Sequence, residues 1–452
     1  MKVKKIFPYC GLILILGIIF WLAVTKDIKN IYLDTDIARD LSELSNLWLH
    51  KMVWLGPRLS PGLHASPIYY YLLYPGLIVF RGSAYSVVYT TLIISMICLW
   101  LFGWLGIKKF GPVFLIAVLL IGTAFWWRTI AVHPGNGYTY GLWIFIGLTT
   151  LYFQTPLFFS AIFLGMAIAY HPATILILPI LFYQWWEKDH QILSLICILI
   201  GLIAPWTPII VFEIITKGFL TRQWLTNPGS GITLTNLNFN NLSNLVLISG
   251  LNNYLAGGLL LLTGFFIPKK LKIWFGLSFI PLIFFAVVSL VPTHYLYGTV
   301  CLWWFLILIT LIQNKIGTIF LLVLSLFFIG KNLLFTSTIH PTRTITKIKS
   351  VVDKLEKTGK IDKNKKIAVV AALDNNTKVP QADDYRFFLR IKGYQVLDVQ
   401  QYSQAKNLIM FIEQPNFDWE KWSTWEIEQS NCRKKIYQYK IEGINVIVWQ
   451  PQ

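Results

Sequence analysis

The chain has 452 residues, 55% of them hydrophobic and only 13% charged, with a mean hydropathy of +0.58 and a formal net charge of +18. A soluble protein usually carries about 25% charged residues, so this composition excludes an ordinary soluble protein. Residues 1–340 hold 20 Lys and Arg against 8 Asp and Glu, whereas residues 341–452 hold 19 against 13. We therefore expect a polytopic membrane domain over 1–340 and a soluble domain over 341–452, with no nucleic acid as a partner.

Long apolar segments follow one another through the first 340 residues. A helix needs about 20 mainly apolar residues to cross a membrane. The segment 156–187 is too long for one span, and His171-Pro172 interrupts it, so we expect two short helices there. With these two, the sequence predicts about eleven spans. The others lie at 8–25, 84–106, 113–130, 136–153, 191–212, 245–267, 271–290, 295–312 and 316–336.

Basic clusters between these segments predict the orientation. If the N-terminus is cytoplasmic and the first span is an uncleaved anchor, every cluster falls on the cytoplasmic side. These clusters lie at residues 2–5, 108–109, 188, 269–272 and 315. The first loop (26–83), the loop 213–244 and the C-terminal domain are then extracytoplasmic. The apolar segment Ile68 to Phe80 contains four tyrosines and Pro75, which favours a helix in the membrane interface.

The pattern changes from Arg343 onward to that of a small α/β module. The sequence predicts helices at 343–358 and 385–391 and a Trp-rich helix at 418–430. It predicts strands at 367–373, 394–399, 407–413, 435–441 and 444–449, the last two forming a hairpin around Glu442-Gly443. Trp419, Trp422 and Trp425 recur at helical spacing, which indicates a packing stripe.

Four of the eight carboxylates in the first 340 residues lie within ten residues, just after the first span. They are Asp34, Asp36, Asp40 and Glu43. If a helix starts near Thr35, the last three stand at i, i+4 and i+7 on one face. Like charges at this spacing destabilise a helix, so the cluster indicates a function. For Asp34 a structural interpretation is favoured, because an Asp at this position caps a helix.

An aromatic and cationic segment follows these acids. It runs from Trp54 through Ser60 to His64 and Tyr69-Tyr70-Tyr71, with Arg39, Lys51 and Arg58 as cations. A carboxylate beside cations at a membrane surface suits deprotonation of an alcohol and binding of a lipid phosphate. We therefore predict a site in which Asp36 acts as a base and the cations bind phosphate.

The sequence resembles a known family at these motifs. The segment 34–40 (DTDIARD), followed by LGPRLS and SPIYYYLLYP, is similar to the first outer loop of C-type (GT-C) glycosyltransferases related to protein mannosyltransferases and aminoarabinose transferases. Segment 165–172 (GMAIAYHP), His294-Tyr295 and segment 383–388 (DDYRFF) resemble further motifs of that family. Ile37 stands where many members have Glu, which argues against a two-carboxylate metal site.

The resemblance implies an inverting transfer of a hexose or pentose from a polyprenyl-phosphate donor to a hydroxyl of a lipid, glycan or protein. Asp36 falls on the essential aspartate of the family, Asp34 beside it is a second catalytic candidate, and no cofactor is implied. The implied substrate-binding residues are Arg39, Asp40, Arg58, His64, Tyr69, Tyr70, His171, His294 and Tyr295. The histidines lack HxxxH or HExxH spacing, so a metal has no support in the sequence. An outer domain without a disulfide framework favours a bacterial plasma membrane.

Two other functions stay open. A transporter or flippase of lipid-linked sugars would also have many spans, but it predicts ionisable residues near the middle of several spans. A non-catalytic envelope-assembly protein would explain the soluble domain but not the carboxylate cluster. Arg128 and His133 are weaker candidates, read as a snorkelling or paired residue and as a helix-end residue. The N-x-S/T triplets at 241–243 and 375–377 match a pattern that is frequent by chance.

Overall fold

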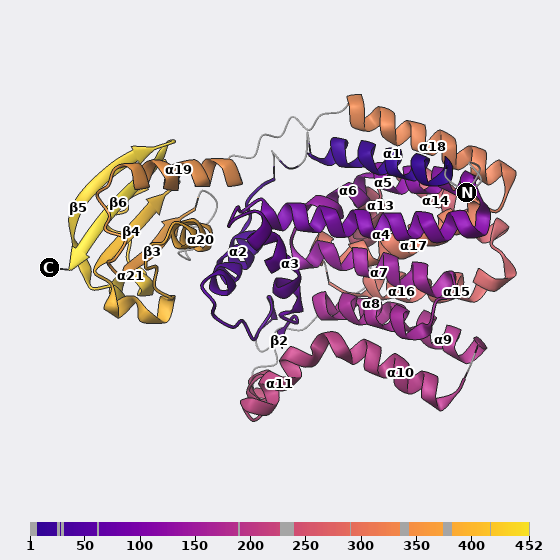
Figure 1. The fold of residues 1–452 in the computed structure, drawn as a ribbon, viewed down its shortest axis with the longest axis horizontal. Coiled ribbons are helices and arrows are strands. Elements are labelled where there is room, and N and C mark those ends of the chain that lie inside the picture. Colours follow the sequence, from indigo (N-terminus) through magenta and orange to yellow (C-terminus); the bar gives the residue numbers. More distant parts are fainter. Residues whose placement is uncertain are drawn as a thin grey trace. The chain divides into compact units, whose positions relative to one another are not determined.

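The computed structural model describes residues 7–24, 28, 31–60, 63–188, 190–226, 239–289, 291–334, 343–373, 382–415 and 417–451 (Figure 1). Contacts between Cα atoms divide the chain into two compact units. The first comprises Met1–Ile28, Trp54–Leu73 and Val88–Thr338, and the second comprises Lys29–Val53, Tyr74–Val87 and Ile339–Gln452. The basic cluster at residues 2–5 and the triplet at 375–377 lie outside the described residues. The predicted limit of the membrane domain at residue 340 stays a prediction.

The first unit consists almost entirely of helices, as its apolar composition predicts. Its elements before residue 180 are α1 (Phe7–Leu22), β1 (Arg58–Ser60), β2 (Leu63–His64), the start of α3 (Ile68–Val79), most of α4 (Ser86–Phe110), η4 (Pro112–Phe114), α5 (Leu115–Thr123), α6 (Phe125–Val132), α7 (Asn136–Tyr152), α8 (Leu157–Tyr170) and η5 (Pro172–Ile177). The later ones are α9 (Leu178–Lys188), α10 (Ile192–Ile203), η6 (Ala204–Trp206), α11 (Thr207–Ile215), α12 (Phe219–Thr226), α13 (Phe239–Ile248), α14 (Asn253–Phe266), η7 (Lys269–Leu271), α15 (Lys272–Leu277), α16 (Phe279–Val287), η8 (Thr293–Leu296), α17 (Tyr297–Leu311) and α18 (Lys315–Leu334).

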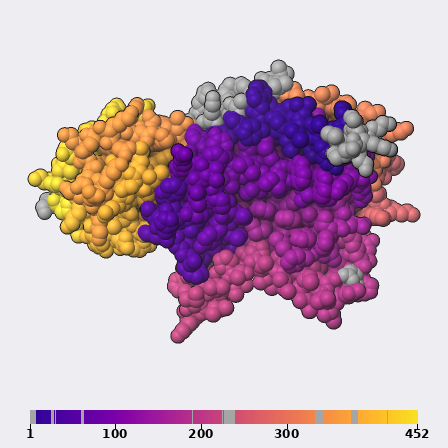
Figure 2. Space-filling model, viewed as in Figure 1, coloured from indigo at the N-terminus to yellow at the C-terminus, as the bar shows by residue number. Residues whose placement is uncertain are grey.

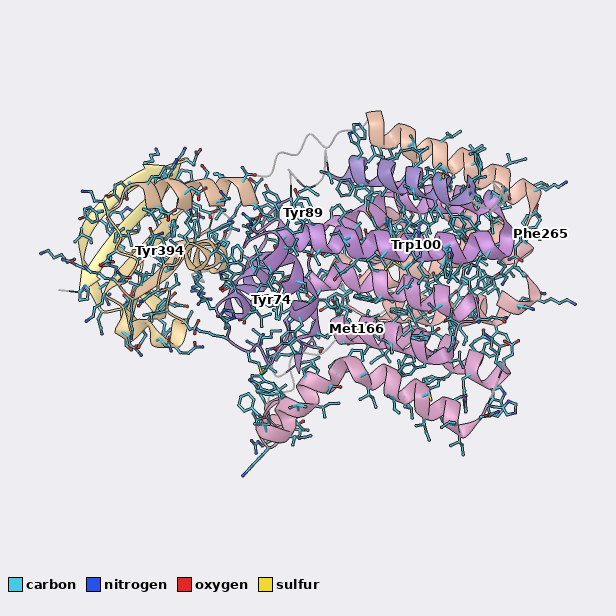
Figure 3. All side chains as sticks on the ribbon, in the orientation of Figure 1. Tyr74, Tyr89, Trp100, Met166, Phe265 and Tyr394 are labelled. Carbon is cyan, nitrogen blue, oxygen red and sulfur yellow. The ribbon has the colours of Figure 1, made fainter. Side chains whose placement is uncertain are left out.

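Many of these helices have the length and composition of membrane spans. Among the described residues, five are long and apolar enough to cross a membrane, or seven if each of two bent pairs counts as one span. Three shorter apolar helices are α1, α3 and α8. Large apolar rings such as Phe265 on α14 (84% exposed) and Trp100 on α4 (42% exposed) face outward, as lipid contact favours (Figure 3). The count of about eleven spans stays a prediction.

Two predicted straight spans are wrong in detail. The span expected at 113–130 bends by 65° between α5 and α6, where Ala124 adopts an extended conformation. The span expected at 245–267 bends by 85° between α13 and α14. Here Gly250 has a φ of +77°, which ends a helix easily, and the Asn252 side chain caps α14 by accepting from the Leu255 N–H at 2.8 Å. Local backbone chemistry therefore outweighs the continuous apolar pattern.

The predicted interruption at His171-Pro172 is confirmed, since α8 ends at Tyr170 and η5 begins at Pro172. Asn241, the first residue of the NLS triplet, is fully buried. Its Nδ2 donates to the carbonyls of Phe285 (3.0 Å) and Ser289 (3.1 Å), and its Oδ1 accepts from the Val291 N–H (3.2 Å). Asn241 thus satisfies the backbone between α16 and η8, which is a structural role.

The second unit is built around a four-stranded sheet in the order β3-β4-β6-β5. Strands β3 and β4 are parallel, and the other neighbours are antiparallel. The hairpin β5–β6 turns at Glu442 (φ +52°) and Gly443 (φ +80°), as predicted. The elements are α2 (Thr35–Trp48), the end of α3, the start of α4, α19 (Ile345–Lys357), β3 (Ile367–Ala372), α20 (Asp383–Ile391), η9 (Val399–Gln404), β4 (Asn407–Ile412), α21 (Trp425–Gln429), β5 (Cys432–Ile441) and β6 (Ile444–Pro451).

Alternate residues of the sheet face two layers, as the period of two predicts. On one face, Tyr385 of α20 stacks on Phe411 of β4 with ring centroids 3.8 Å apart. On the other face, Met410 joins a core with Tyr402 and Ile427. The C-terminal elements, orange to yellow in Figure 2, form a close-packed body.

Two predicted elements of this module are wrong. Residues 394–399 make only one bridge, from Val396 to Ile367, because the chain turns into η9 at Val399. The Trp-rich helix shortens to the five residues of α21, since Trp419 and Trp422 lie before it and pack against the sheet. Trp425 is exposed, so only two of the three tryptophans form the predicted packing stripe.

A buried ionic network connects the elements of the second unit. The Arg343 guanidinium pairs with the carboxylates of Asp384 and Glu413, at 3.0 Å from Nε to Oε1 for Glu413. The Tyr385 hydroxyl donates to Glu413 at 2.9 Å. One cation thus faces two carboxylates. Burial, helped by the charge of Glu413 and opposed by Arg343, raises the pKa of Asp384 to about 6.

This raised pKa predicts a pH dependence of stability. The folded unit favours protonated Asp384, so the stabilisation is complete below about pH 4 and is lost as the pH rises to about 6. We expect hydrogen-exchange protection of β3 and α20, corrected for intrinsic rates, to fall over this range in the full protein. Asp384→Asn should flatten the profile. Protection that rises between pH 4 and 6 in the wild type would contradict the prediction.

Candidate functional site

The carboxylate cluster lies on helix α2, as predicted. Asp34 is its N-cap, and the side chain accepts from the Ile37 N–H at 2.8 Å. Apolar residues including Ile37, Leu41 and Leu44 form the buried face. Asp36 lies in the first turn, where the helix dipole favours a negative charge. The capping interpretation of Asp34 is therefore confirmed, and a catalytic part for Asp34 stays a prediction.

Arg39 joins two of the acids. Its Nε and Nη2 both donate to Oδ1 of Asp40, at 3.0 and 2.9 Å, and its Nη1 donates to Oδ1 of Asp36 at 2.9 Å. The Asp40 side chain is 4% exposed, whereas that of Asp36 is 59% exposed. The buried Asp40 therefore orients Arg39, and Arg39 in turn orients an Asp36 that is open at the surface of its unit. This arrangement can present a carboxylate to a hydroxyl beside a fixed cation.

The remaining polar residues of this segment have other partners. Glu43 is partly buried and accepts from Asn46 Nδ2 at 3.1 Å. Burial raises the pKa of Glu43, which the Asn46 hydrogen bond partly offsets. Lys51 pairs with Asp398 at 3.4 Å. Of the predicted cluster, Asp36, Arg39 and Asp40 are thus brought together, whereas Lys51 turns to the C-terminal elements.

Three histidines of the first unit share one local design, in which each lies at a helix end within two residues of a proline. His133 follows α6 and precedes Pro134, His171 follows α8 and precedes Pro172, and His294 lies in η8 after Pro292. A proline ends the preceding helix because the residue before it disfavours helical geometry. The sequence thus places each imidazole at a break in the apolar helices.

The rings of these histidines gather with tyrosines. His171 lies 4.3 Å from Tyr295 and 6.2 Å from His294, measured between ring centroids. Tyr138 lies 3.9 Å from His133 and 5.7 Å from His294. His171, His294 and Tyr295 were each predicted as substrate-binding residues, but their grouping was not. Tyr138 was missed, although its place in the fourth position after His133-Pro134 was a usable signal.

His171 carries a polar atom with no partner. Its Nδ1 accepts from the Ala173 N–H at 3.3 Å, which leaves the proton on Nε2. Within the described part of the chain, this Nε2 is buried and makes no hydrogen bond. A buried donor without an acceptor is costly. An oxygen atom of a bound ligand would satisfy it.

Tyr69 and Tyr70 are both buried, and Tyr69 donates to the Pro134 carbonyl. Asn136 in turn donates from Nδ2 to the Tyr170 carbonyl at 3.0 Å. The hydroxyl of Tyr140 donates to the Tyr295 carbonyl at 2.7 Å and accepts from the Gly298 N–H at 2.8 Å. Tyr69 and Tyr70 therefore pack inward rather than lie at the surface of the membrane interface expected for this segment, and Tyr69 braces the break at His133-Pro134.

Arg58 and His64 lie on the small ribbon of β1 and β2, paired in register. Arg58 is exposed, and His64 Nδ1 donates to the Gly56 carbonyl at 3.0 Å. Both belong to the first unit, whereas Asp36 and Arg39 belong to the second. Arg128 is 8% exposed within α6, at the helix position where the sequence suggested a paired or snorkelling residue.

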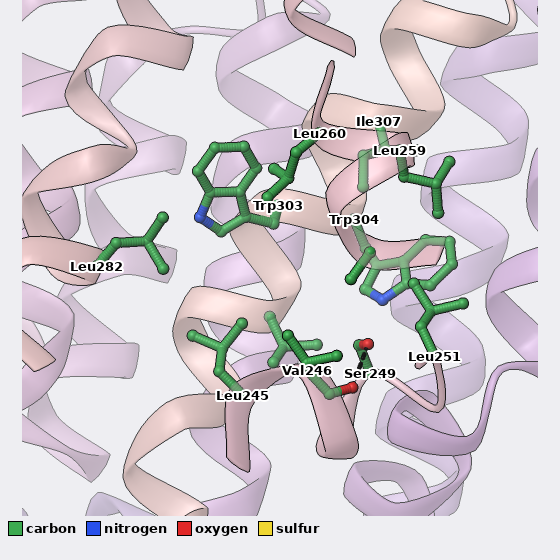
Figure 4. A pocket seen from close by; sticks show the side chains of 12 residues that line it. Leu245, Val246, Ser249, Leu251, Leu259, Leu260, Leu282, Trp303, Trp304 and Ile307 are labelled. Carbon is green, nitrogen blue, oxygen red and sulfur yellow. Dashed lines mark hydrogen bonds between the residues drawn. The ribbon is translucent and has the colours of Figure 1, made fainter. Parts of the chain in front are cut away.

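An apolar groove opens between α13, α14, α16 and α17 (Figure 4). Its volume is about 60 Å³, and the hydroxyl of Ser249 in its lining donates to the Val246 carbonyl at 2.6 Å. Val300 on α17 belongs to the lining and lies six residues after His294, which is in the preceding element η8. The lining residues are Leu245, Val246, Ser249, Leu251, Ala256, Leu259, Leu260, Leu282, Val300, Trp303, Trp304 and Ile307.

No set of three or more His, Cys, Asp and Glu side chains with metal-binding geometry occurs within the described ranges. The predicted independence of a metal or cofactor stays a prediction.

The whole chain is similar in fold to ArnT. The structure of ArnT from Cupriavidus metallidurans bound to undecaprenyl phosphate matches with a TM-score of 0.61 and 13% identity, covering 96% of this chain and 97% of that one. The apo structure of the same protein matches with the same TM-score and coverage at 11% identity. No protein-family model and no curated protein sequence matches the chain. The predicted likeness to aminoarabinose transferases of the GT-C type is thus confirmed at the level of the fold.

Proposed function

We propose that this protein is an inverting glycosyltransferase that moves one sugar, a hexose or pentose, from a polyprenyl-phosphate donor to a hydroxyl acceptor. The observation that carries the proposal is the exposed Asp36 carboxylate, oriented through Arg39 by the buried Asp40, in a chain with the fold of ArnT. Because an ArnT structure contains undecaprenyl phosphate, a donor of this lipid class suits the fold. The acceptor is a lipid, glycan or protein.

The proposed transfer step needs a base for the acceptor hydroxyl and groups that neutralise the departing phosphate, and residues of this chain can supply both. Asp36 removes the proton of the acceptor hydroxyl as its oxygen attacks the anomeric carbon. The bond from that carbon to the phosphate oxygen breaks on the opposite face, and its electron pair leaves with polyprenyl phosphate. Arg39, which donates to Asp36 within the same unit, is the group that would neutralise this phosphate; Arg58 and His294 are further residues that the sequence names for this role. Within the first unit, the unpartnered Nε2–H of His171 would donate to an oxygen of a bound ligand.

We place the reaction at the outer face of a bacterial plasma membrane. The basic clusters that follow the apolar segments support about eleven spans with a cytoplasmic N-terminus. In this topology α2, His294 and the C-terminal elements share the extracytoplasmic side. The donor's hydrocarbon chain would lie in the apolar groove, whose lining includes Val300 of α17, six residues after His294 in the sequence.

Product analysis tests the function directly. Purified protein is incubated with crude membrane acceptors and a panel of polyprenyl-phosphate sugars, and free polyprenyl phosphate is detected by mass spectrometry. We expect release with at least one donor and inversion at the anomeric carbon of the product. No release across the panel, combined with movement of lipid-linked sugar between vesicle leaflets, would instead identify a transporter.

Filling the groove should discriminate between donors by chain length. Ala256→Trp places a large ring in the lining, so we expect kcat/KM for long-chain donors to fall about three- to tenfold relative to short-chain donors. The effect is modest because the hydrocarbon leaves lipid for an equally apolar site and gains only packing. Gly257→Trp is the control, since nothing lies within 4 Å of a Cβ there. Equal losses with both chain lengths would place the hydrocarbon elsewhere.

A further inference from the structure

The segment that leads into α2 is fastened to the C-terminal elements. Tyr32 and Thr344 form an antiparallel bridge, and the Leu33 N–H donates to the Arg343 carbonyl at 3.1 Å. The Arg343 side chain returns the contact by donating from Nη1 to the Leu33 carbonyl. Leu33 directly precedes the cap residue Asp34. The start of α2 is therefore tied to a residue more than 300 positions away in the sequence.

Arg343 is itself immobilised by its partners. Its side chain is 4% exposed and pairs with Asp384 of α20 and with Glu413, which follows β4. Rigid elements of the α/β module thus set the direction of this guanidinium. Because Arg343 donates a hydrogen bond to the Leu33 carbonyl, the position of the module fixes the position of the start of α2.

The far end of α2 has a second tie, through Arg390 of α20. This side chain is 3% exposed and donates to Ser45 Oγ at 3.1 Å, to Asn46 Oδ1 at 3.4 Å and to Asp398 Oδ1 at 2.7 Å. Two of these acceptors lie on α2 and the third in the module. Buried arginines thus hold both ends of the helix that bears Asp36. If the only role of the C-terminal module were to bind an acceptor, the hydrogen bonds from Arg343 and Arg390 to the two ends of α2 would not be needed.

We propose that the C-terminal module positions the base Asp36, with Arg343 and Arg390 as positioning residues. This inference rests on the proposed transferase function. Catalysis depends steeply on geometry, and a displacement of about 1 Å costs up to 10²-fold in rate. A helix held at both ends keeps Asp36 in register with the reacting hydroxyl. The module is then part of the catalytic apparatus through α2, whatever acceptor it meets.

The test uses two arginines of the same helix in the full-length protein. Arg390→Ala removes the tie to α2, whereas Arg386→Ala removes contacts to Asp383, Tyr402 and Val369 within the module. Arg386 is also buried, so both substitutions perturb the module. We expect Arg390→Ala to lower kcat at least tenfold with the donor KM changed less than threefold, and to speed hydrogen exchange in 35–48. Arg386→Ala should leave both nearly unchanged.

Conservative variants sharpen the result. Arg390→Lys keeps the charge and one donor, so partial recovery of kcat is expected. Wild-type kcat in Arg390→Ala, or an equal loss of kcat in Arg386→Ala, would overturn the positioning role and leave the transferase function standing. An inactive wild type would overturn the function together with the catalytic meaning of the ties. The two failures are therefore distinguishable.

Discussion

Asp36→Asn is expected to lower kcat by about 10²- to 10⁴-fold, a loss of about 3 to 5 kcal/mol of transition-state stabilisation. The amide keeps the shape of the side chain but cannot take the acceptor proton. Because Asp36 is exposed at the N-terminal turn of α2, its replacement should hardly change stability. Release of polyprenyl phosphate under single-turnover conditions measures the effect. Donor binding should be retained, so the loss appears in kcat.

Asp34→Asn provides the matched comparison two residues away. Asn caps a helix about as well as Asp, so the hydrogen bond to the Ile37 N–H can be kept while the charge is removed. Activity close to the wild type is expected if Asp34 acts only as the cap. A comparable loss in both variants would assign Asp34 a catalytic part. An active Asp36→Asn protein would remove the general base from the mechanism.

Gly137→Ala is expected to lower kcat by about 10²-fold while the fold is kept. A Cβ at Gly137 would lie 2.5 Å from Cδ2 and 3.1 Å from Cγ of His294, so the whole imidazole must move. Such a shift removes the ring from its place beside Tyr138 and His171. If His294 contacts the donor phosphate, as proposed, a displacement of this size costs about that factor in rate. The rate of polyprenyl phosphate release, measured at saturating donor, checks the prediction.

The same substitution elsewhere separates this effect from a general one. Gly17 lies in α1, and no atom lies within 4 Å of a Cβ built there. Gly17→Ala should therefore keep full activity and stabilise the helix slightly, by up to about 1 kcal/mol. If Gly137→Ala were also fully active, the position of the His294 ring would have no bearing on turnover. Thermal unfolding of both variants serves as the control for folding.

Much of the fold could be predicted because its signals are local. The cap at Asp34, the break at His171-Pro172 and the turn at Glu442-Gly443 depend on neighbours within a few residues. The bend at Gly250 was missed for a related reason. The apolar run continues through it, and the conformation of one glycine decides the outcome.

The site was harder to predict because its geometry depends on distant contacts. Sequence spacing places Asp36 and Asp40 on one face of α2, yet Asp36 is open and Asp40 is buried. Burial changes along the helix because packing within the unit covers its later turns, and that packing involves residues from the other end of the chain, such as Arg390. Tyr69 and Tyr70 were expected at a surface for the same reason. Their burial depends on elements that sequence spacing does not report.

The hydrogen bonds of Asn241 connect the apolar groove with the segment that carries His294. This residue lies on α13, whose later residues line the apolar groove, and it holds the backbone that leads to His294. If the donor's hydrocarbon chain lies in this groove, as proposed, it would act through Asn241 on the backbone of residues 285–291, which precedes η8 and His294. Binding of the donor's hydrocarbon tail would then affect the position of the residues proposed to bind its phosphate. Donors with a shortened hydrocarbon chain should therefore have a low kcat even at saturating concentration. The chain length of the carrier then affects kcat as well as donor affinity.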